Sequence, residues 1–295
     1  MECDLCSGKE LQIAYPVPTT RRNLSIYVCK NCGLVQSFPK IDHIKQNNIA
    51  ISGDADWGNV RYGKAFVSKK AINILSETIK LEKIENCLDI GSNRGSFVIG
   101  LKRIFPNIDF VAIEPDEKII DVYSNDHKIK VINERFENVK LDKNSFDLVY
   151  CSHTLEHLKS PKQSLKKIFN IIKQNGILYL EVPNLNAISN SSMVEEWFID
   201  KHLYHFSLEL LERYLLIENF EIIYKDSSDD LNITIIAKKQ KSNNFKCNLE
   251  NLSEYRKNIK LIERYCNTLK INQFKLKKVG EKINKLSKEN KMIIW

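Results

Sequence analysis

The stretch "CLDIGSNRGSF" at residues 87–97 decides the interpretation of the fold. It begins as an apolar run, which is typical of a buried strand, and ends in a turn that contains Gly91 and Gly95. In an open α/β sheet, ligands bind outside the carboxyl ends of the strands, where a strand turns into its helix. Gly91 lets the chain leave the strand in a conformation that other residues avoid. Gly95 removes side-chain bulk where free helical N–H groups point at a ligand.

The turn lacks both of the common phosphate-binding patterns. A Walker loop needs Gly-Lys-Ser/Thr after four spacers, and a dinucleotide fingerprint needs Gly-x-Gly-x-x-Gly, whereas this chain has Gly91-x-x-x-Gly95. Asp89 is a carboxylate that suits an ammonium group and repels phosphate. Glu114, roughly 20 residues after the turn, occupies the place where an acidic side chain accepts the two hydroxyls of a ribose. An adenosine that carries an amino acid fits both carboxylates.

Short apolar runs alternate with amphipathic segments along much of the chain, which predicts a mostly parallel sheet with helices on both faces. We expect parallel strands at 87–90, 110–113, 130–132, 146–150 and 177–182, and an antiparallel pair at 220–224 and 231–237. We expect helices over 63–80, from Ser207 to about Glu218, and from starts near Gly95, Asp116 and Ser160. For the last of these, Pro161 fits the first position and Gly176 fits the end.

Together these segments resemble the class I S-adenosylmethionine-dependent methyltransferases, across roughly residues 60–238. The resemblance rests on "LDIGSNRGSF", "IEP", "NSFDLVYCSHTLEHL" and "LYLEVPN". It implies a Rossmann-like, seven-stranded α/β sheet and S-adenosylmethionine as the cofactor. It also implies that Glu114 holds the ribose and that Phe136 flanks the adenine. Ser152 and His153 would lie near the methionine and the sulfonium, and the methionine part would be surrounded by Asp89, Gly91, Ser92, Asn93 and Gly95.

Residues 1–45 carry two Cys-x-x-Cys pairs, Cys3 with Cys6 and Cys29 with Cys32. Four thiolates in two close pairs are the arrangement that tetrahedral Zn²⁺ requires, and four protein ligands leave no open position. We therefore expect a structural zinc in a small N-terminal module. A nucleic-acid-binding ribbon is the alternative, but the segment between the pairs supplies only one compact basic spot. Redox pairing of the cysteines is a further alternative.

This pattern ahead of a class I domain resembles the nucleotide-sugar methyltransferases of deoxysugar and polysaccharide pathways. Some of those enzymes have a third, nucleotide-binding domain, and the final "ENKMIIW" looks like the opening strand of such a domain. We expect a zinc-binding module at 1–45, a methyltransferase domain at 46–245 and a basic helical connector at 246–295. The apolar stripe of the connector is expected to pack on the protein's own surface. A homodimer through these helices is the alternative, which Gly280 disfavours because it interrupts the stripe.

Methyl transfer also needs a group that takes the acceptor's proton. The loop "EEWFIDKHLYHFS" at residues 195–207 follows the fifth strand and offers His202, Tyr204 and His205, and His157 lies nearby. Histidine titrates close to neutral pH, so His202 is the expected base and the other three are further candidates.

The residues before His202 bear on the methyl acceptor. In the C-methyltransferases that resemble this chain, the loop typically reads Tyr-His-Glu-His. Here Ile199, Asp200 and Lys201 precede His202, so the tyrosine and the glutamate are absent. Carbon methylation needs groups that generate and hold an enolate, and their absence favours oxygen as the acceptor.

The leading hypothesis is therefore methyl transfer to a hydroxyl of a nucleotide-linked sugar. The alternatives are C-methylation of a keto sugar, an RNA-modifying enzyme and a non-catalytic scaffold. The formal net charge of +8 suggests nucleic acid, but the basic excess lies in residues 246–295 and the remainder is balanced, which argues against that partner. No window approaches the ~18 apolar residues of a membrane helix, and no secretory pattern opens the chain. We expect a cytoplasmic protein without membrane insertion.

Overall fold

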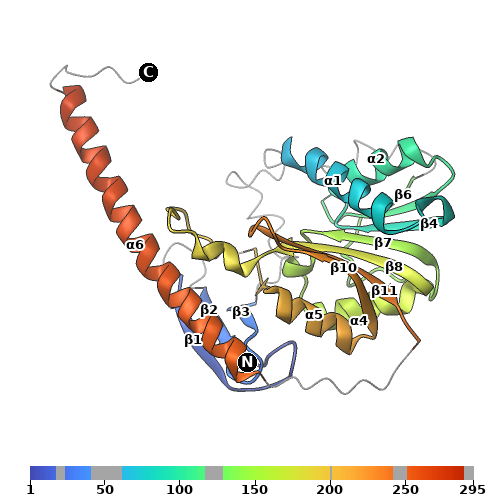
Figure 1. The fold of residues 1–295 in the computed structure, drawn as a ribbon, viewed down its shortest axis with the longest axis horizontal. Coiled ribbons are helices and arrows are strands. Elements are labelled where there is room, and N and C mark those ends of the chain that lie inside the picture. The colour runs from blue at the N-terminus through green and yellow to red at the C-terminus, as the bar shows by residue number, and fades with distance from the viewer. Residues whose placement is uncertain (18–23, 41–61, 117–128, 200, 242–250, 289–295) are drawn as a thin grey trace.

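The structure is a computed structural model that describes residues 1–17, 24–40, 62–116, 129–199, 201–241 and 251–288. These residues form a seven-stranded sheet, a four-stranded sheet and one long helix (Figure 1). The helix expected near Asp116 falls at 117–128, outside the described residues.

The large sheet is mostly parallel, as the sequence predicts. Its strand order is β10-β11-β8-β7-β4-β5-β6, with β4 at the centre of the parallel part and β11 antiparallel to both of its neighbours. Parallel pairing brings the carboxyl ends of β4, β5 and β7 to one edge. The strands are β4 (Asn86–Ile90), β5 (Asp109–Ile113), β6 (Ile129–Ile132), β7 (Phe146–Ser152), β8 (Ile172–Pro183), β10 (Phe220–Asp226) and β11 (Asn232–Lys239).

Helices cover both faces of this sheet (Figure 1). On one face Leu75 and Phe97 share a buried cluster with Phe110, and on the other Leu165 and Leu211 pack with the rest of the core. The first face carries α1 (Tyr62–Thr78) and α2 (Ser96–Ile104), and the second carries α4 (Pro161–Ile171) and α5 (Leu208–Ile217). The short 3-10 helices are η3 (Leu81–Lys83), η4 (Leu155–His157) and η5 (Leu185–Ser189).

The expected helix starts at Ser160 and Ser207 are confirmed. The Ser160 hydroxyl accepts a hydrogen bond from Gln163 N at 3.2 Å, with Pro161 in the first turn, and the Ser207 hydroxyl accepts one from Leu210 N at 3.4 Å. Each hydroxyl satisfies one of the N–H groups that a helix leaves unpaired at its start.

The predicted role of Gly176 is wrong. Helix α4 ends at Ile171 and β8 begins directly at Ile172, so Gly176 lies inside the strand rather than after a helix. A Cβ on Gly176 would lie 2.6 Å from Ile172 Cγ2 and 2.9 Å from Lys173 O. The glycine therefore permits a close backbone approach where the register between β7 and β8 shifts.

The small sheet joins the N-terminal module to the main domain. Strands β1 (Leu11–Pro16), β2 (Ser25–Cys29) and β3 (Val35–Phe38) pair in order, and β9 (Tyr204–His205) adds a fourth strand beside β3. Val35 pairs with His205. The loop that carries the expected base is thus part of the sheet of the N-terminal module.

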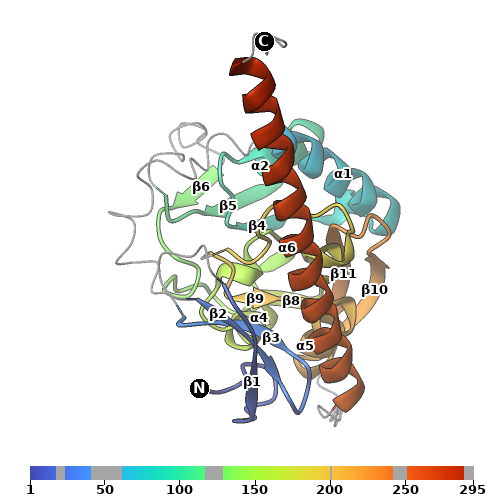
Figure 2. The ribbon, with the colours of Figure 1, turned by 90° about the vertical axis from the view of Figure 1, so that its left-hand side faces the viewer.

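The expected helical connector is one continuous helix, α6 (Leu252–Lys288). Gly280 does not interrupt it, because a helix tolerates a solvent-exposed glycine at a modest cost in stability. A Cβ on Gly280 would meet no atom of the described residues within 4 Å. The first half packs on the small sheet through buried Ile262, Tyr265 and Leu269 (Figure 2). The second half leaves the body of the molecule (Figure 1), with Phe274 and Val279 more than half exposed. The expected packing on the protein's own surface holds for the first half only.

Among the helices that the structure describes, none has both the length and the apolar character needed to cross a membrane.

Candidate active site

The turn after β4 is hydrogen-bonded to the end of β5. Gly91 N and Ser92 N both donate to Ile113 O, at 2.9 and 3.0 Å. Gly91 has a φ of +71°, and a Cβ there would lie 2.1 Å from Thr154 Oγ1. Thr154 Oγ1 itself donates to Ile90 O at 3.1 Å. Gly91 is therefore required both by its backbone conformation and by the threonine that closes over the turn.

Two buried carboxylates flank this turn. Asp89 is 2% exposed, and Glu114 follows β5 directly. Glu114 Oε2 accepts a hydrogen bond from Asn93 N at 2.7 Å, and Oε1 accepts one from Asp116 N at 3.1 Å. Gly95, with a φ of +70°, is the N-cap of α2, so that helix begins at the turn. The structure thus gathers six of the expected cofactor residues at one edge: Asp89, Gly91, Ser92, Asn93, Gly95 and Glu114.

Ser152 and His153, at the end of β7, meet a glutamate that the sequence analysis did not select. Ser152 Oγ lies 3.2 Å and His153 Nε2 lies 3.3 Å from Glu181 Oε1. His153 Nδ1 also lies 3.7 Å from Glu156 Oε1. Burial lowers the pKa of His153, but the two carboxylates outweigh burial and raise the pKa to about 9. His153 is therefore an imidazolium at neutral pH.

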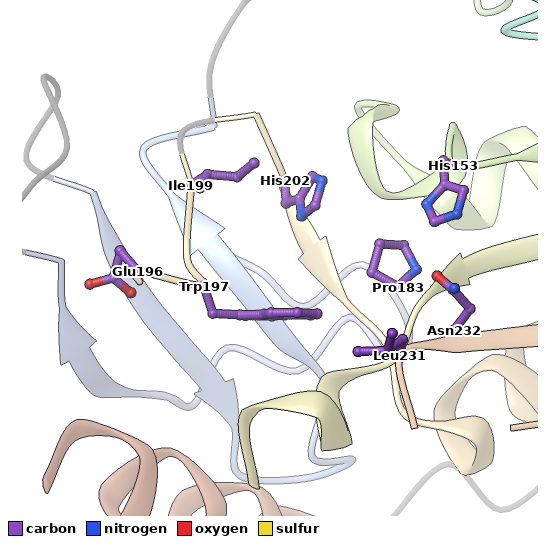
Figure 3. A pocket seen from close by; sticks show the side chains of 8 residues that line it. All are labelled: His153, Pro183, Glu196, Trp197, Ile199, His202, Leu231 and Asn232. Atoms are coloured by element: carbon purple, nitrogen blue, oxygen red, sulfur yellow. The ribbon is translucent and has the colours of Figure 1, made fainter. Parts of the chain in front are cut away.

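A cavity of about 430 Å³ lies beside this edge (Figure 3). Volumes of this size are typical of small-molecule sites. His153 and His202 supply polar groups to it, and the Trp197 ring supplies a flat apolar surface. The lining residues are His153, Pro183, Glu196, Trp197, Ile199, His202, Leu231 and Asn232.

The loop that walls the cavity is anchored from two distant parts of the chain. Tyr15 OH, in β1, donates to Glu196 Oε2 at 2.8 Å, and Tyr265 OH, in α6, donates to Glu196 Oε1 at 2.5 Å. Tyr265 OH also accepts a hydrogen bond from Trp197 N at 2.8 Å. The N-terminal module and the last helix therefore position this wall together.

His202, which lines the cavity, lies next to His157, with ring centroids 4.9 Å apart. Burial, and next the neighbouring His157, lower the pKa of His202 to about 3, so its ring is neutral at pH 7. His157 Nδ1 lies 2.8 Å from Lys201 O, and since a carbonyl only accepts, Nδ1 carries a hydrogen. Burial raises the pKa of Glu156, but the histidines outweigh it and hold the pKa at about 2. Glu156 is therefore an ionised carboxylate in the interior.

Of the four catalytic candidates only His202 lines the cavity, and His205 and Tyr204 are buried elsewhere. His205 is 4% exposed, with Nε2 3.1 Å from Ser37 Oγ and its ring edge-on to Phe198. Tyr204 is 1% exposed, and its hydroxyl donates to Lys159 O at 2.8 Å. Both belong to β9, whose pairing with β3 directs their side chains into the contact between the module and the main domain.

Comparison with known proteins now identifies the domain. Residues 63–225, more than half of the chain, match the model of the family described as "Methyltransferase domain". The chain belongs to this methyltransferase family. The fold and the gathered carboxylate edge accord with this, and the protein is an S-adenosylmethionine-dependent methyltransferase.

Individual relatives of this methyltransferase are distant. The carboxy-S-adenosyl-L-methionine synthase of Nautilia profundicola is 23% identical over 168 residues, which cover 53% of this chain and 71% of the synthase. The ribosomal RNA small subunit methyltransferase G of Malacoplasma penetrans is 31% identical over 123 residues, 38% of this chain and about half (52%) of that enzyme. Among solved structures, the cyclase SpnF has a TM-score of 0.50 at 14% identity, with 65% of this chain and 86% of SpnF covered. That likeness concerns the fold alone.

Phe136, the residue expected to flank the adenine of the methyltransferase's cofactor, is 3% exposed and belongs to the main core. Lys167 Nζ lies 4.6 Å from the centre of its ring and donates to Val139 O at 2.6 Å. The role of Phe136 in adenine binding stays a prediction.

The four cysteines of the N-terminal module come together as the sequence predicts. Cys3 Sγ lies 3.4 Å from Cys32 Sγ, and Cys6 Sγ lies 3.6 Å from Cys29 Sγ, with all four sulfurs within 4.8 Å of one another. A disulfide would need about 2 Å, whereas sulfurs bound to one tetrahedral Zn²⁺ are about 3.8 Å apart. The four residues therefore fit a tetrahedral metal ion.

Sequence reasoning missed Thr154, Glu181 and the cavity residues Trp197 and Asn232. Glu181 could have been found, because a charged residue within the apolar run "LYLEVP" of a buried strand indicates a satisfied internal charge. Thr154 had no such signal, since its role follows from a contact with Gly91, which is distant in sequence.

Proposed function

We propose that this methyltransferase transfers the methyl group of S-adenosylmethionine to a hydroxyl of a nucleotide-linked sugar bound in the 430 Å³ cavity. The observation that carries the proposal is the joint presence there of a neutral His202 and a cationic His153, beside the carboxylate edge. The Trp197 ring offers a surface on which the C–H face of a sugar can rest. We infer the nucleotide part of the substrate from the resemblance of the cysteine module and the domain to nucleotide-sugar methyltransferases.

The reaction needs one displacement and one proton transfer. An acceptor oxygen lone pair forms the C–O bond, the C–S bond breaks, and S-adenosylhomocysteine leaves. As the methyl group is transferred the oxygen becomes positively charged, so its proton becomes strongly acidic and even a weakly basic ring can take it. A His202 that is neutral above about pH 3 is able to accept that proton throughout the physiological range.

The activity test is release of S-adenosylhomocysteine from a panel of sugar nucleotides, with mass spectrometry of the product. We expect His202→Ala to lower kcat by ~10²-fold or more at saturating cofactor, the usual contribution of proton transfer. Full turnover in that variant would remove His202 from the mechanism. Incorporation of deuterium at the acceptor carbon in heavy water, without cofactor, would indicate C-methylation instead.

We keep RNA modification as a second candidate because the exposed second half of α6 is rich in lysine, with Lys275, Lys277, Lys278, Lys282 and Lys285. An RNA substrate would bind with an affinity that falls steeply as salt rises. Methylation of a free sugar nucleotide at a rate that salt leaves unchanged would exclude this candidate. We also propose that the four cysteines hold a structural Zn²⁺, supported by the sulfur separations described above.

A further inference from the structure

We propose that Glu156, His157 and His202 form a second metal site, for a divalent first-row transition-metal ion at the inner side of the cavity. Glu156 and His157 come from η4, and His202 comes from the segment that leads into β9. One ligand atom from each residue lies within 4.8 Å of the other two. The site shares no residue with the four cysteines.

The strongest support for a metal ion is the environment of the Glu156 carboxylate. Glu156 is 1% exposed, and neither of its side-chain oxygens has a hydrogen-bond partner within the part of the chain that the structure describes. His153 Nδ1 and His157 Nε2 face Oε1, but at 3.7 and 3.6 Å they are too distant for hydrogen bonds. The His153 imidazolium offsets part of the charge of Glu156, but the carboxylate oxygens stay without hydrogen bonds, and a coordinated cation would satisfy them.

His157 has the orientation that metal-binding histidines adopt. Its Nδ1–H donates to Lys201 O at 2.8 Å, which fixes the ring and turns Nε2 toward Glu156. Two ligands that each lie ~2.1 Å from one ion at a tetrahedral angle are about 3.4 Å apart. The observed 3.6 Å between His157 Nε2 and Glu156 Oε1 therefore leaves space for one ion between them.

His202 completes the set and gives the site its opening. Its ring lies beside that of His157 and also lines the cavity. Two imidazoles and one carboxylate are the ligands of catalytic Zn²⁺ sites and of the facial triads that bind Fe²⁺. Three protein ligands leave a coordination position free, and because His202 also lines the cavity, a molecule in the cavity could occupy that position. An acceptor hydroxyl bound to the ion would lose its proton more easily, and His202 would then act as a ligand and not as the base. This catalytic role rests on the proposed function, whereas binding of the ion does not.

The test counts metal ions per chain. Wild-type protein, dialysed against metal-free buffer, is titrated with Zn²⁺, and bound metal is measured by elemental analysis. We compare it with Glu156→Gln, His157→Gln and His202→Gln. The control is His205→Gln, which alters a buried imidazole 6.2 Å from the ring of His202 but outside the set. Thermal unfolding identifies variants that do not fold, and only folded variants are scored.

We expect the wild type and His205→Gln to hold one more ion per chain than each of the three ligand variants. With Co²⁺ as the probe, this extra ion should add weak visible bands without thiolate charge transfer, because its ligands are nitrogen and oxygen. Equal metal content in the wild type and in a folded ligand variant would overturn the inference. Loss of turnover in His202→Ala without any extra ion in the wild type would also overturn it while leaving His202 as a base. An extra ion without methylation of any sugar nucleotide would support the site and count against the proposed function.

Discussion

At the scale of single residues, Gly91 shows how one hydrogen in place of a methyl group shapes the turn at the carboxylate edge. Its φ is positive, and Thr154 Oγ1 occupies the space that a Cβ would need. Gly91→Ala therefore combines ~1–2 kcal/mol of backbone strain with a steric clash, and we expect it to weaken cofactor binding and to lower the free energy of unfolding by more than ~2 kcal/mol. Denaturant unfolding and calorimetry with S-adenosylhomocysteine measure the two effects.

The double variant Gly91→Ala/Thr154→Ala separates the two causes. It removes Thr154 Oγ1, the atom of closest approach, so part of the lost stability should return while the strain from the backbone remains. A single Gly91→Ala variant with wild-type stability would contradict the argument.

His153 provides a prediction about pH. Its pKa is raised to about 9, so the charged ring adds stability fully below the ordinary pKa of about 6.5, and this contribution disappears as pH rises through 9. Glu181→Gln removes one of the two carboxylates and should move the pKa of His153 down toward 6.5. NMR titration of the His153 ring in both proteins measures the shift. An unchanged value would show that Glu181 does not stabilise the imidazolium.

Residues at the carboxyl ends of strands were predictable, and residues defined by distant contacts were not. Asp89 and Glu114 were found because parallel strands bring their carboxyl ends to one edge, which the spacing of two strands reveals. Tyr204 and His205 share a loop with His202 and looked equivalent to it. Their burial results from the pairing of β9 with β3, a strand more than 160 residues away in the sequence. Ser37 in β3, for example, contacts His202 across 165 residues and His205 across 168 residues.

At the scale of the element, α6 divides into a docked half and an exposed half with the same apolar stripe. Ile262 is fully buried, and Ile271 is 53% exposed. Ile262→Ala should lower the free energy of unfolding by about 2–5 kcal/mol, as for other buried isoleucines, whereas Ile271→Ala should change it by less than ~0.5 kcal/mol. Denaturant unfolding of both variants measures the difference. Equal values would mean that the docked half contributes nothing to stability.

Glycines limited how well element boundaries could be predicted. Gly176 suggested a helix end and Gly280 an interruption of the apolar stripe, yet Gly176 lies in a strand and Gly280 lies inside the continuous helix α6. A glycine has the same sequence signature whether it ends a helix, relieves a crowded strand or is merely exposed. Neighbouring atoms distinguish these cases: they crowd Gly176 and are absent within 4 Å of Gly280 in the described structure.

At the scale of the whole molecule, the cysteine cluster and α6 form one unit. A Cβ on Gly33, which follows Cys32, would lie 2.7 Å from Tyr255 N, and Asn258 Nδ2 donates to Gly33 O at 2.9 Å. Helix α6 thus rests directly on the second Cys-x-x-Cys turn. The fold of this turn and the position of the helix depend on each other.

We expect Cys29→Ser to lose one Zn²⁺ per chain, to lower the melting temperature and to release the first half of α6 from the small sheet. Elemental analysis, calorimetry and hydrogen exchange of α6 amides measure the three effects. The proposed metal site at Glu156 serves as an internal control, because Cys29→Ser should leave the ion at that site in place. A wild-type protein without thiolate-bound metal would contradict the zinc proposal.

The two tyrosines on Glu196 have a consequence for the order of folding during synthesis. Tyr15 leaves the ribosome 250 residues before Tyr265, and both donate to the same carboxylate. A nascent chain can therefore form the carboxylate edge before both tyrosines hold this wall of the cavity. This wall of the cavity is held on both sides only after Tyr265 has been translated.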